Sequence, residues 1–271
     1  MTKERLDKIL TDKGYFETKN KAQAAIMAGD VKVDGKIITK AGFPVDIKEN
    51  TIIEIKSMPF VSRGGYKLDK AIKEFNINLK NIICLDAGAS TGGFTDCMLQ
   101  NGARKVYSVD VGYGQIAWKL RTNPKVKVIE KVNIKNCIET DIYNSDEEYA
   151  SFLTMDLSFI SITKVIPNLI KLADKKGFEI VSLIKPQFEA GKEKVGKNGV
   201  IREKDTHIEV IRNIVTYCSE MKLYPKALSF SPIKGPKGNI EYLIYLSPIF
   251  QDNTVNIDIE SVVNNAHANT F

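Results

Sequence analysis

The chain has 271 residues, a net charge of +6 at pH 7 and a sequence pI near 8.9. Its 43% hydrophobic and 27% charged residues are typical of a soluble globular protein, and no apolar run approaches the roughly 18–20 residues of a membrane span. The length favours two domains, and the moderate positive charge permits a polyanionic partner without requiring one. Because the amino terminus lacks the apolar core of a signal peptide, a cytoplasmic location is expected.

The cysteines and histidines exclude two kinds of chemistry. The four cysteines lie far apart without a Cys-x-x-Cys pair, and are predicted to be free and buried. The two histidines, His207 and His267, cannot supply a metal cluster, and neither has a nucleophilic neighbour typical of a catalytic triad. The sequence therefore predicts no metal site and no triad.

Residues 1–57 are predicted to form a small α+β module. Residues 5–10 are amphipathic, and Lys19–Met27 repeats apolar residues at helical spacing before Gly29. Residues 31–33 and 36–38 flank Asp34 and Gly35, a strong hairpin signal, and residues 50–55 predict another strand. The segment 58–60 contains Pro59 and is typical of a linker.

From residue 81 the pattern changes to apolar strands separated by helical stretches. This pattern predicts an α/β domain over residues 58–250, with a seven-stranded, mostly parallel Rossmann-like sheet and helices on both faces. A polar, asparagine-rich tail, loosely attached, is expected at residues 251–271. The predicted strands cover residues 82–86, 106–110, 126–129, 152–156, 180–184, 227–230 and 242–245.

The first of these strands runs into a glycine-rich loop, residues 86–93, that precedes a predicted helix. Glycines let a ligand approach the backbone, so a nucleotide-like ligand is one interpretation. The spacing of Asp86, Gly88 and Gly92 differs from a dinucleotide fingerprint, and Asp86 would repel a pyrophosphate but suits the ammonium of a methionine group. A purely structural turn and a dinucleotide site remain the alternatives.

Polar residues also end three later strands. Asp110 can accept hydrogen bonds from both hydroxyls of an adenosine ribose, and its position after the glycine loop favours that role over an exposed strand end. Asp156 and Lys185 end strands at the edge where open α/β sheets bind ligands, although a lysine there can simply extend to solvent.

Several ordered motifs together resemble a known family. Residues 62–68 (Ser-Arg-Gly-Gly-Tyr-Lys-Leu), residues 86–94, Asp156, residues 185–189 (Lys-Pro-Gln-Phe-Glu) and Glu241 resemble the FtsJ-like rRNA methyltransferases, and the TlyA family in particular. Residues 1–57 resemble the RNA-binding module of ribosomal small-subunit protein four. The resemblance covers nearly the whole chain and implies S-adenosylmethionine as cofactor. It also implies 2′-O-methylation of cytidine ribose in 16S or 23S rRNA, with ribosomal RNA or ribosomal subunits as partner.

The resemblance also assigns roles to residues. In FtsJ-like enzymes a Lys-Asp-Lys-Glu tetrad surrounds the acceptor ribose, and the matching residues here are Lys67, Asp156, Lys185 and Glu241. Lys185 is the candidate base for the 2′-hydroxyl, although a purely orienting role is left open. Phe94 stands where the narrower FtsJ group often has tryptophan. The cofactor contacts implied by the loop and the resemblance together are Asp86, Gly88, Gly92, Phe94, Asp110, Asn133 and Asp156.

Basic residues of the module are candidates for RNA binding. Arg5, Lys8, Lys19 and Lys21 are expected to contact RNA, with Arg63 contributing from the catalytic domain. The alternative is that the module's lysines and arginine are ordinary solvated positions. Because acidic residues are interspersed, recognition of folded RNA by its shape is expected.

Other functions are tested by the motifs that the chain contains and lacks. No Pro-Pro loop typical of base-amino methylation follows Asp156, and no proline precedes a cysteine as in cytosine-carbon methylation. A hemolysin-like membrane-active protein is an alternative that the absence of a membrane-length apolar run disfavours. An RNA-binding ribosome-assembly factor without catalysis is the other, and the intact tetrad disfavours it.

Overall fold

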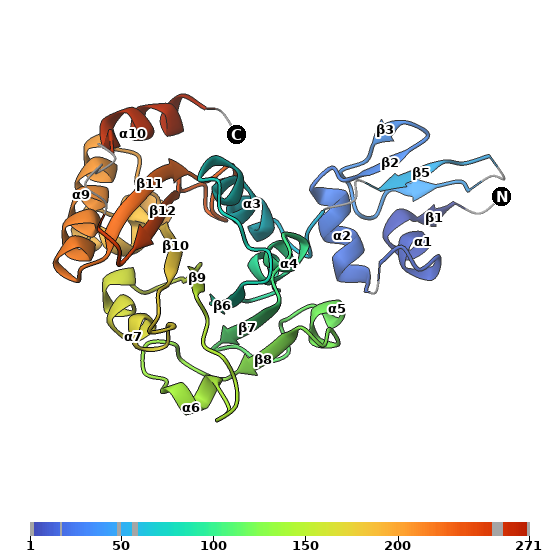
Figure 1. Cartoon of the computed structure of the whole chain (residues 1–271). Helices are drawn as coiled ribbons and strands as arrows, with labels where there is room; N and C mark the ends of the chain where they lie inside the picture. Colours follow the sequence, from blue (N-terminus) through green and yellow to red (C-terminus); the bar gives the residue numbers. More distant parts are fainter. Residues whose placement is uncertain (1–2, 17, 48–49, 56–58, 251–256, 270–271) are drawn as a thin grey trace. The chain divides into compact units, whose positions relative to one another are not determined.

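A computed structural model of the chain describes residues 3–16, 18–47, 50–55, 59–250 and 257–269 (Figure 1). It divides into two compact units, Met1–Pro59 and Phe60–Phe271. The boundary predicted between residues 57 and 58 lies outside the described residues.

The first unit combines two helices with short strands. Asp34 and Gly35 join strands β2 and β3 with φ angles of 50° and 75°, the left-handed conformations that a two-residue hairpin turn requires, so the predicted hairpin is confirmed. Leu6, Leu10 and Ile26 are fully buried and form the centre of this unit's core. The elements are β1 (Glu4–Arg5), α1 (Leu6–Asp12), α2 (Lys19–Met27), β2 (Val31–Val33), β3 (Lys36–Ile37), β4 (Pro44–Val45) and β5 (Ile53–Ile55).

The second unit is built on a sheet of seven strands. Its spatial order is β11-β12-β10-β9-β6-β7-β8, in which β12 is antiparallel to both neighbours and the other pairings are parallel. This arrangement confirms the predicted Rossmann-like sheet. Its strands are β6 (Ile83–Ala87), β7 (Lys105–Asp110), β8 (Val126–Glu130), β9 (Phe152–Met155), β10 (Glu179–Ile184), β11 (Tyr224–Phe230) and β12 (Tyr242–Ser247).

Helices cover both faces of this sheet (Figure 1). Side chains alternate along each strand: on β6, Leu85 packs with α7 and α9 on one face, whereas Cys84 packs with α3 and α4 on the other. The helices are α3 (Gly64–Glu74), α4 (Gly93–Gln100), α5 (Trp118–Arg121), α6 (Glu139–Ile142), α7 (Ile166–Lys171), α8 (Pro186–Glu189), α9 (Lys204–Glu220) and α10 (Ile259–Ala268), with short 3₁₀ turns at Ile162–Lys164, Lys192–Lys194 and Lys197–Gly199.

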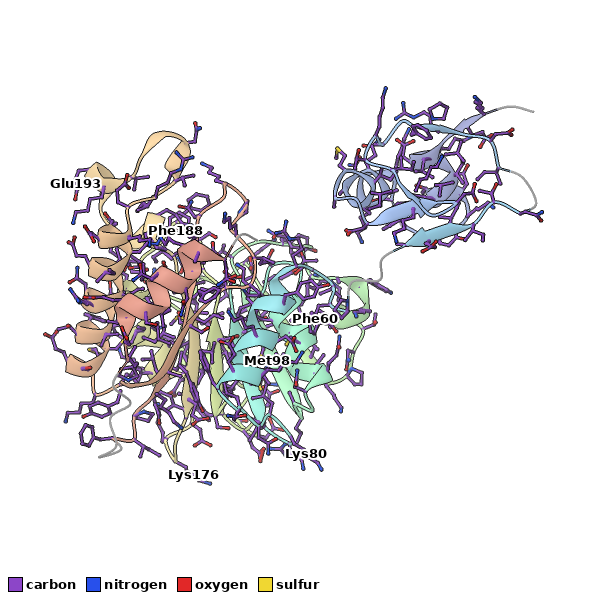
Figure 2. All side chains as sticks on the ribbon, turned by 90° about the horizontal axis from the view of Figure 1, so that it is seen from above. Phe60, Lys80, Met98, Lys176, Phe188 and Glu193 are labelled. Atoms are coloured by element: carbon purple, nitrogen blue, oxygen red, sulfur yellow. The ribbon has the colours of Figure 1, made fainter. Side chains whose placement is uncertain are left out.

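The order of the strands determines where a ligand can bind. The chain leaves β6 toward β7 and β8 on one side, and then returns to place β9 and β10 on the other side. In open α/β sheets, ligands bind at the carboxyl ends of the strands where the order reverses in this way, which here is between β6 and β9. Figure 2 shows Lys80 and Lys176, which precede β6 and β10, at the opposite edge from Phe188, which follows β10.

The carboxyl-terminal segment differs from the expected loose tail. Residues 259–268 form α10, which begins at Asp258, whose side chain accepts a 2.9 Å hydrogen bond from Ser261 N. Val263 and Ala266 are fully buried and pack in the core beside α9. The expectation of a loosely attached tail is therefore wrong for residues 257–269, because their apolar side chains share one helical face. Residues 251–256 and 270–271 lie outside the described residues.

Candidate active site

Four charged side chains from four elements lie at the carboxyl edge of the sheet. Asp156 directly follows β9, and Lys185 directly follows β10. Glu241 directly precedes β12, which is antiparallel to β10, so that Ile184 pairs with Tyr242 and places Glu241 beside Lys185. Lys67 comes from α3. The structure therefore brings together all four residues of the predicted tetrad.

The four side chains form a continuous chain of contacts. Lys67 Nζ lies 2.7 Å from Glu241 Oε2 and 3.3 Å from Asp156 Oδ2, and it donates a hydrogen bond to each. Lys185 Nζ lies 2.6 Å from Asp156 Oδ1, a contact that is an ion pair rather than an aligned hydrogen bond. The side chain of Glu241 is 1% exposed, that of Lys185 8%, that of Lys67 9% and that of Asp156 19%. Asp156 is thus the most solvent-accessible member.

The surroundings of Asp156 and of Lys67 favour their charged forms. Burial alone would lower the pKa of Lys67, but the negative charges of Asp156 and Glu241 raise that pKa above its ordinary value. Burial would raise the pKa of Asp156, but Lys185 and Lys67 bring it below its usual value. Lys67 is therefore held as an ammonium between two carboxylates.

The glycine loop lies beside this cluster. Gly88 and Gly92 have φ angles of 85° and 96°, which non-glycine residues rarely adopt. A Cβ at Gly88 would lie 3.1 Å from the backbone oxygen of Asp156, and one at Gly92 would lie 2.3 Å from Leu120 Cδ1. These glycines are required by close packing within the protein as well as by the turn itself.

Asp110 connects the glycine loop to the next strand. Its Oδ2 accepts a 2.7 Å hydrogen bond from Ser90 N, and its Oδ1 accepts one of 2.7 Å from Gly112 N. Each carboxylate oxygen has a second lone pair, so Asp110 can still accept hydroxyl donors from a ligand. Asn133 follows β8 and is exposed, with its Oδ1 accepting a hydrogen bond from Lys135 N.

Two predicted cofactor contacts are not at the open edge. Asp86 is fully buried, and its carboxylate accepts hydrogen bonds from Thr95 N, Thr95 Oγ1 and Thr154 Oγ1. Burial raises its pKa to about 6. Phe94 is 3% exposed and packs in the core formed with α3 and α4. Both side chains therefore already have partners inside the protein, and their roles as cofactor contacts stay predictions.

The candidate RNA-binding residues of the first unit are exposed and organised by an acidic residue. Arg5 donates two hydrogen bonds to the fully buried Asp7, and Lys19 Nζ lies 4.0 Å from the same carboxylate. Lys8 forms longer ion pairs with Glu4 and Asp12 on one face of α1. Lys21 lies in the first turn of α2, where its backbone N–H donates to Thr18 Oγ1.

Arg63 belongs to the second unit, at the start of α3. It is exposed and precedes Lys67 by four residues, about one helical turn. It therefore lies on the same side of the helix as a tetrad residue.

The sequence pattern did not single out three residues near the tetrad. Ser158 Oγ lies 3.2 Å from Lys185 Nζ and accepts its hydrogen bond. Phe159 is 88% exposed, has a φ of 64° and packs against Phe188 with ring centroids 5.2 Å apart. Glu189 binds the same loop through its carboxylate. Glu189 is the last residue of the motif at residues 185–189, which was quoted for the family resemblance without a role for this residue, whereas for Ser158 and Phe159 the only signal was their position after Asp156.

No cluster of three or more histidine, cysteine or acidic side chains suited to a metal ion occurs in the described part of the chain. The four cysteines, as predicted, are free and buried: Cys84, Cys97, Cys137 and Cys218. Among the residues that the structure describes, no helix has the length and apolar character needed to span a membrane.

Comparisons with known proteins agree with this geometry. Residues 60–247 match the FtsJ-like methyltransferase family, and residues 4–52 match the S4 domain. YqxC of Bacillus subtilis, which is named as an rRNA methyltransferase, is 44% identical over 244 residues, which cover 90% of this chain and 85% of that protein. The 16S/23S rRNA (cytidine-2′-O)-methyltransferase TlyA of Mycobacterium tuberculosis is 37% identical over 243 residues, covering 89% of each chain.

A solved structure extends the likeness to the whole fold. A protein from Streptococcus thermophilus that is named as a hemolysin is 40% identical to this chain. The two structures superpose with a TM-score of 0.76 over 98% of this chain and 96% of that one. The fold and the site define a methyltransferase with an amino-terminal RNA-binding module. The chain belongs to the TlyA family of FtsJ-like methyltransferases.

Proposed function

We propose that the protein is an S-adenosylmethionine-dependent methyltransferase that modifies the 2′-oxygen of cytidine in ribosomal RNA. The observation that carries this proposal is the ion-paired chain of Glu241, Lys67, Asp156 and Lys185 at the ligand-binding edge of the sheet. The relative named for cytidine-2′-O-methylation of 16S and 23S rRNA supports the nucleotide and the RNA class.

The residues at the switch point fit the proposed cofactor. Asp110 is partly exposed and has acceptor capacity left for the two ribose hydroxyls, and the partly buried Asp156 lies beside Gly88 of the glycine loop. Gly88, Gly92 and the exposed Asn133 are the other residues proposed to surround it. When bound, S-adenosylmethionine supplies the methyl group on a positively charged sulfur.

Lys67 and the two carboxylates are proposed to orient the acceptor ribose. Lys67 is an ammonium that donates to Asp156 and Glu241, so it can donate a further hydrogen bond but cannot take up a proton. Glu241 is almost fully buried and fixes the Lys67 amine. This arrangement prepares a rigid polar surface for one hydroxyl group.

Lys185 is the proposed base. It contacts one carboxylate and the hydroxyl of Ser158, whereas Lys67 contacts two carboxylates and is held as an ammonium, so Lys185 is the amine of the tetrad that remains for this role. In the neutral form, its Nζ can accept the proton of the 2′-hydroxyl as the oxygen attacks the methyl group. Holding that oxygen about 3 Å from the methyl carbon and in line with its bond to sulfur lowers the barrier further.

The first unit is proposed to provide affinity for RNA. Asp7 holds Arg5 and Lys19 within reach of one another, which gives two neighbouring cations for phosphate groups. Arg63 is proposed to extend phosphate binding toward the tetrad.

The test is methyl transfer to ribosomal subunits isolated from cells that lack the gene. With labelled S-adenosylmethionine, label is expected in a nucleoside that mass analysis identifies as 2′-O-methylcytidine. The modified linkage should resist alkali, because cleavage requires a free 2′-hydroxyl. Cofactor binding without transfer would instead support an RNA-binding assembly factor, and label on a base would refute ribose as the acceptor.

A further inference from the structure

The motif that contains Lys185 ends in a carboxylate whose position is not explained by cofactor or ribose binding. Glu189 is the last residue of α8, which begins directly after Lys185. Its Oε2 accepts a 2.6 Å hydrogen bond from Ser161 Oγ, and its Oε1 accepts one of 2.9 Å from Ile162 N. Both donors belong to the segment that follows Asp156. One carboxylate therefore ties the continuation of β10 to the continuation of β9.

The segment held in this way carries two unusual residues. Ser158 lies between Asp156 and the tie, and its hydroxyl accepts the hydrogen bond of Lys185 Nζ at 3.2 Å. Phe159 has a φ of 64°, a left-handed conformation that costs roughly 1–2 kcal/mol for a residue other than glycine. Such a conformation persists only when surrounding contacts hold it, and Glu189 supplies two of these contacts.

The electrostatics of Glu189 also indicate a role beyond stability. Burial raises its pKa, and its two hydrogen bonds together with the positive charge of Lys164 offset only part of this effect. Within the described ranges, no lysine or arginine lies within ion-pair distance of this carboxylate, so Lys164 acts on it only at longer range. A partly buried carboxylate without an ion-pair partner is a costly way to close a loop, and an apolar contact would stabilise the fold more simply.

We propose that Glu189 is a positioning residue for methyl transfer, which fixes the loop after Asp156 so that Ser158 and Asp156 together orient the Lys185 amine. This inference rests on the proposed function, since it concerns the same reaction. The segments that follow β9 and β10 are thus joined at two places, by the contact of Asp156 with Lys185 and by the hydrogen bond that Ile162 N donates to Glu189. Loss of the tie should misplace the amine without removing any group that touches the cofactor or the ribose.

The experiment compares Glu189→Ala, Glu189→Gln and Ser161→Ala with a matched control, Glu193→Ala, in the full chain. Glu193 is an exposed glutamate four residues further along (Figure 2). For Glu189→Ala, the single-turnover rate at saturating RNA and cofactor should fall about 10- to 100-fold, the scale of a small misplacement of reacting groups. The cofactor affinity should stay within about twofold, as measured by calorimetry.

Two further readouts separate positioning from a general structural role. Glu189→Gln should recover most of the rate, because its amide oxygen still accepts from Ile162 N and its NH₂ can donate to Ser161 Oγ. The effects of Glu189→Ala and Ser161→Ala should be non-additive, because both remove the same tie. If Glu189→Ala fails to fold, Ser161→Ala alone must lower the rate for the inference to stand.

The outcomes distinguish this inference from the function on which it rests. A parent chain that transfers no methyl group would refute the proposed function and the inference together. An active parent whose Glu189→Ala and Ser161→Ala variants match Glu193→Ala would refute the inference alone. A loss of cofactor affinity in parallel with rate would also overturn it, because it would indicate a structural role.

Discussion

At the scale of single residues, the two lysines of the tetrad differ in the side chains that surround them. Lys67 lies between Asp156 and Glu241 and is held as an ammonium, whereas Lys185 contacts Asp156 and the hydroxyl of Ser158. A sequence pattern shows that both lysines are present, but the number of carboxylates around each depends on how β9, β10 and β12 are aligned. The roles follow from that alignment.

Asp110→Ala is expected to weaken cofactor binding. It removes the two proposed contacts to the ribose hydroxyls, each worth about 1.5–3 kcal/mol, so that calorimetry should show a loss of affinity of at least about tenfold. Asp174→Ala is the matched control, since Asp174 likewise accepts a hydrogen bond from the backbone two residues on, at Lys176 N, near the opposite edge of the sheet. Unchanged affinity in a folded Asp110→Ala variant would remove Asp110 from the cofactor site.

Asp86→Asn is expected to change how stability depends on pH. The folded-state pKa of Asp86 is about 6, above its ordinary value of 3.8, so its ionised form is disfavoured in the folded protein. The parent chain should therefore lose stability from this group as pH rises from about 4 to 6, by up to about 3 kcal/mol. Asparagine does not titrate, and its amide can donate a hydrogen bond to Thr154 Oγ1. The Thr154 hydroxyl can then donate its own hydrogen bond to Leu85 O.

Chemical unfolding at several pH values provides the measurement. The free energy of unfolding of Asp86→Asn, minus that of the parent, should increase from pH 4 to pH 6 and then level off. A difference that does not vary with pH would mean that Asp86 titrates near its ordinary value in the folded chain.

The sequence predicted residue types at the site better than their orientation. Lys67, Asp156, Lys185 and Glu241 meet as the family resemblance implied, and the places of Asp156 and Lys185 at strand ends of one sheet gave an independent reason for two of them. Asp86 was expected at the open edge, but its side chain turns inward to Thr95 and Thr154. Alternation along a strand determines which way a side chain points, and a single residue's register at a strand end is not fixed by pattern alone. The roles of the site residues stay predictions.

At the scale of elements, the amino-terminal ends of α3 and α4 lie unusually close together. A Cβ on Gly93 would lie 2.3 Å from Ser62 Oγ and 2.8 Å from Gly65 N. Since Lys67 lies in the first turns of α3, this contact sets the position of its amine.

Gly93→Ala is expected to destabilise the protein by about 1–3 kcal/mol, because backbone atoms must move apart. Gly64→Ala is the matched control: its Cβ would meet nothing nearer than Ser62 Oγ at 3.4 Å, so it should be neutral or stabilising by up to about 1 kcal/mol. Thermal unfolding of the two variants tests the contact. Equal stability would show that α3 can move without cost.

The elements themselves were largely predictable, with one instructive exception. The seven strands of the sheet were expected within a few residues of their observed bounds, because buried parallel strands appear as apolar runs. Helix α10 was not predicted, because the sequence from residue 251 onward is rich in polar residues. Its apolar residues Ile259, Val262, Val263 and Ala266 nevertheless recur at helical spacing after the capping Asp258, a signal that was present in the sequence.

At the scale of the whole molecule, the chain combines two compact units with separate cores. The tetrad lies wholly within the second unit, and the cations organised by Asp7 lie wholly within the first. The change of sequence pattern around the segment 58–60 and the family resemblance both predicted two units of this kind, whereas the length of the chain indicated only that two domains were expected. The choice of nucleotide depends on contacts with RNA, which neither unit's fold specifies.

A chain that begins at Phe60 is expected to fold and bind the cofactor but to methylate ribosomal RNA poorly. Its affinity for RNA should depend less steeply on salt, because each phosphate contact that is lost lowers the slope by roughly 0.7–0.9. Filter binding across a series of salt concentrations, together with calorimetry of cofactor binding, makes the comparison. Activity and salt slope equal to those of the full chain would show that the first unit is dispensable.

Lys185 is the residue on which the proposed chemistry depends most directly, and its replacement by methionine keeps the apolar stem and approximate volume. With RNA and cofactor saturating, the single-turnover rate of methyl transfer by Lys185→Met should fall about 10²–10⁴-fold, while both affinities change little. Lys185→Arg should not restore the rate, because a guanidinium stays protonated. A rate near that of the parent in Lys185→Met would contradict a catalytic tetrad, and a fast Lys185→Arg variant would exclude Lys185 as the base.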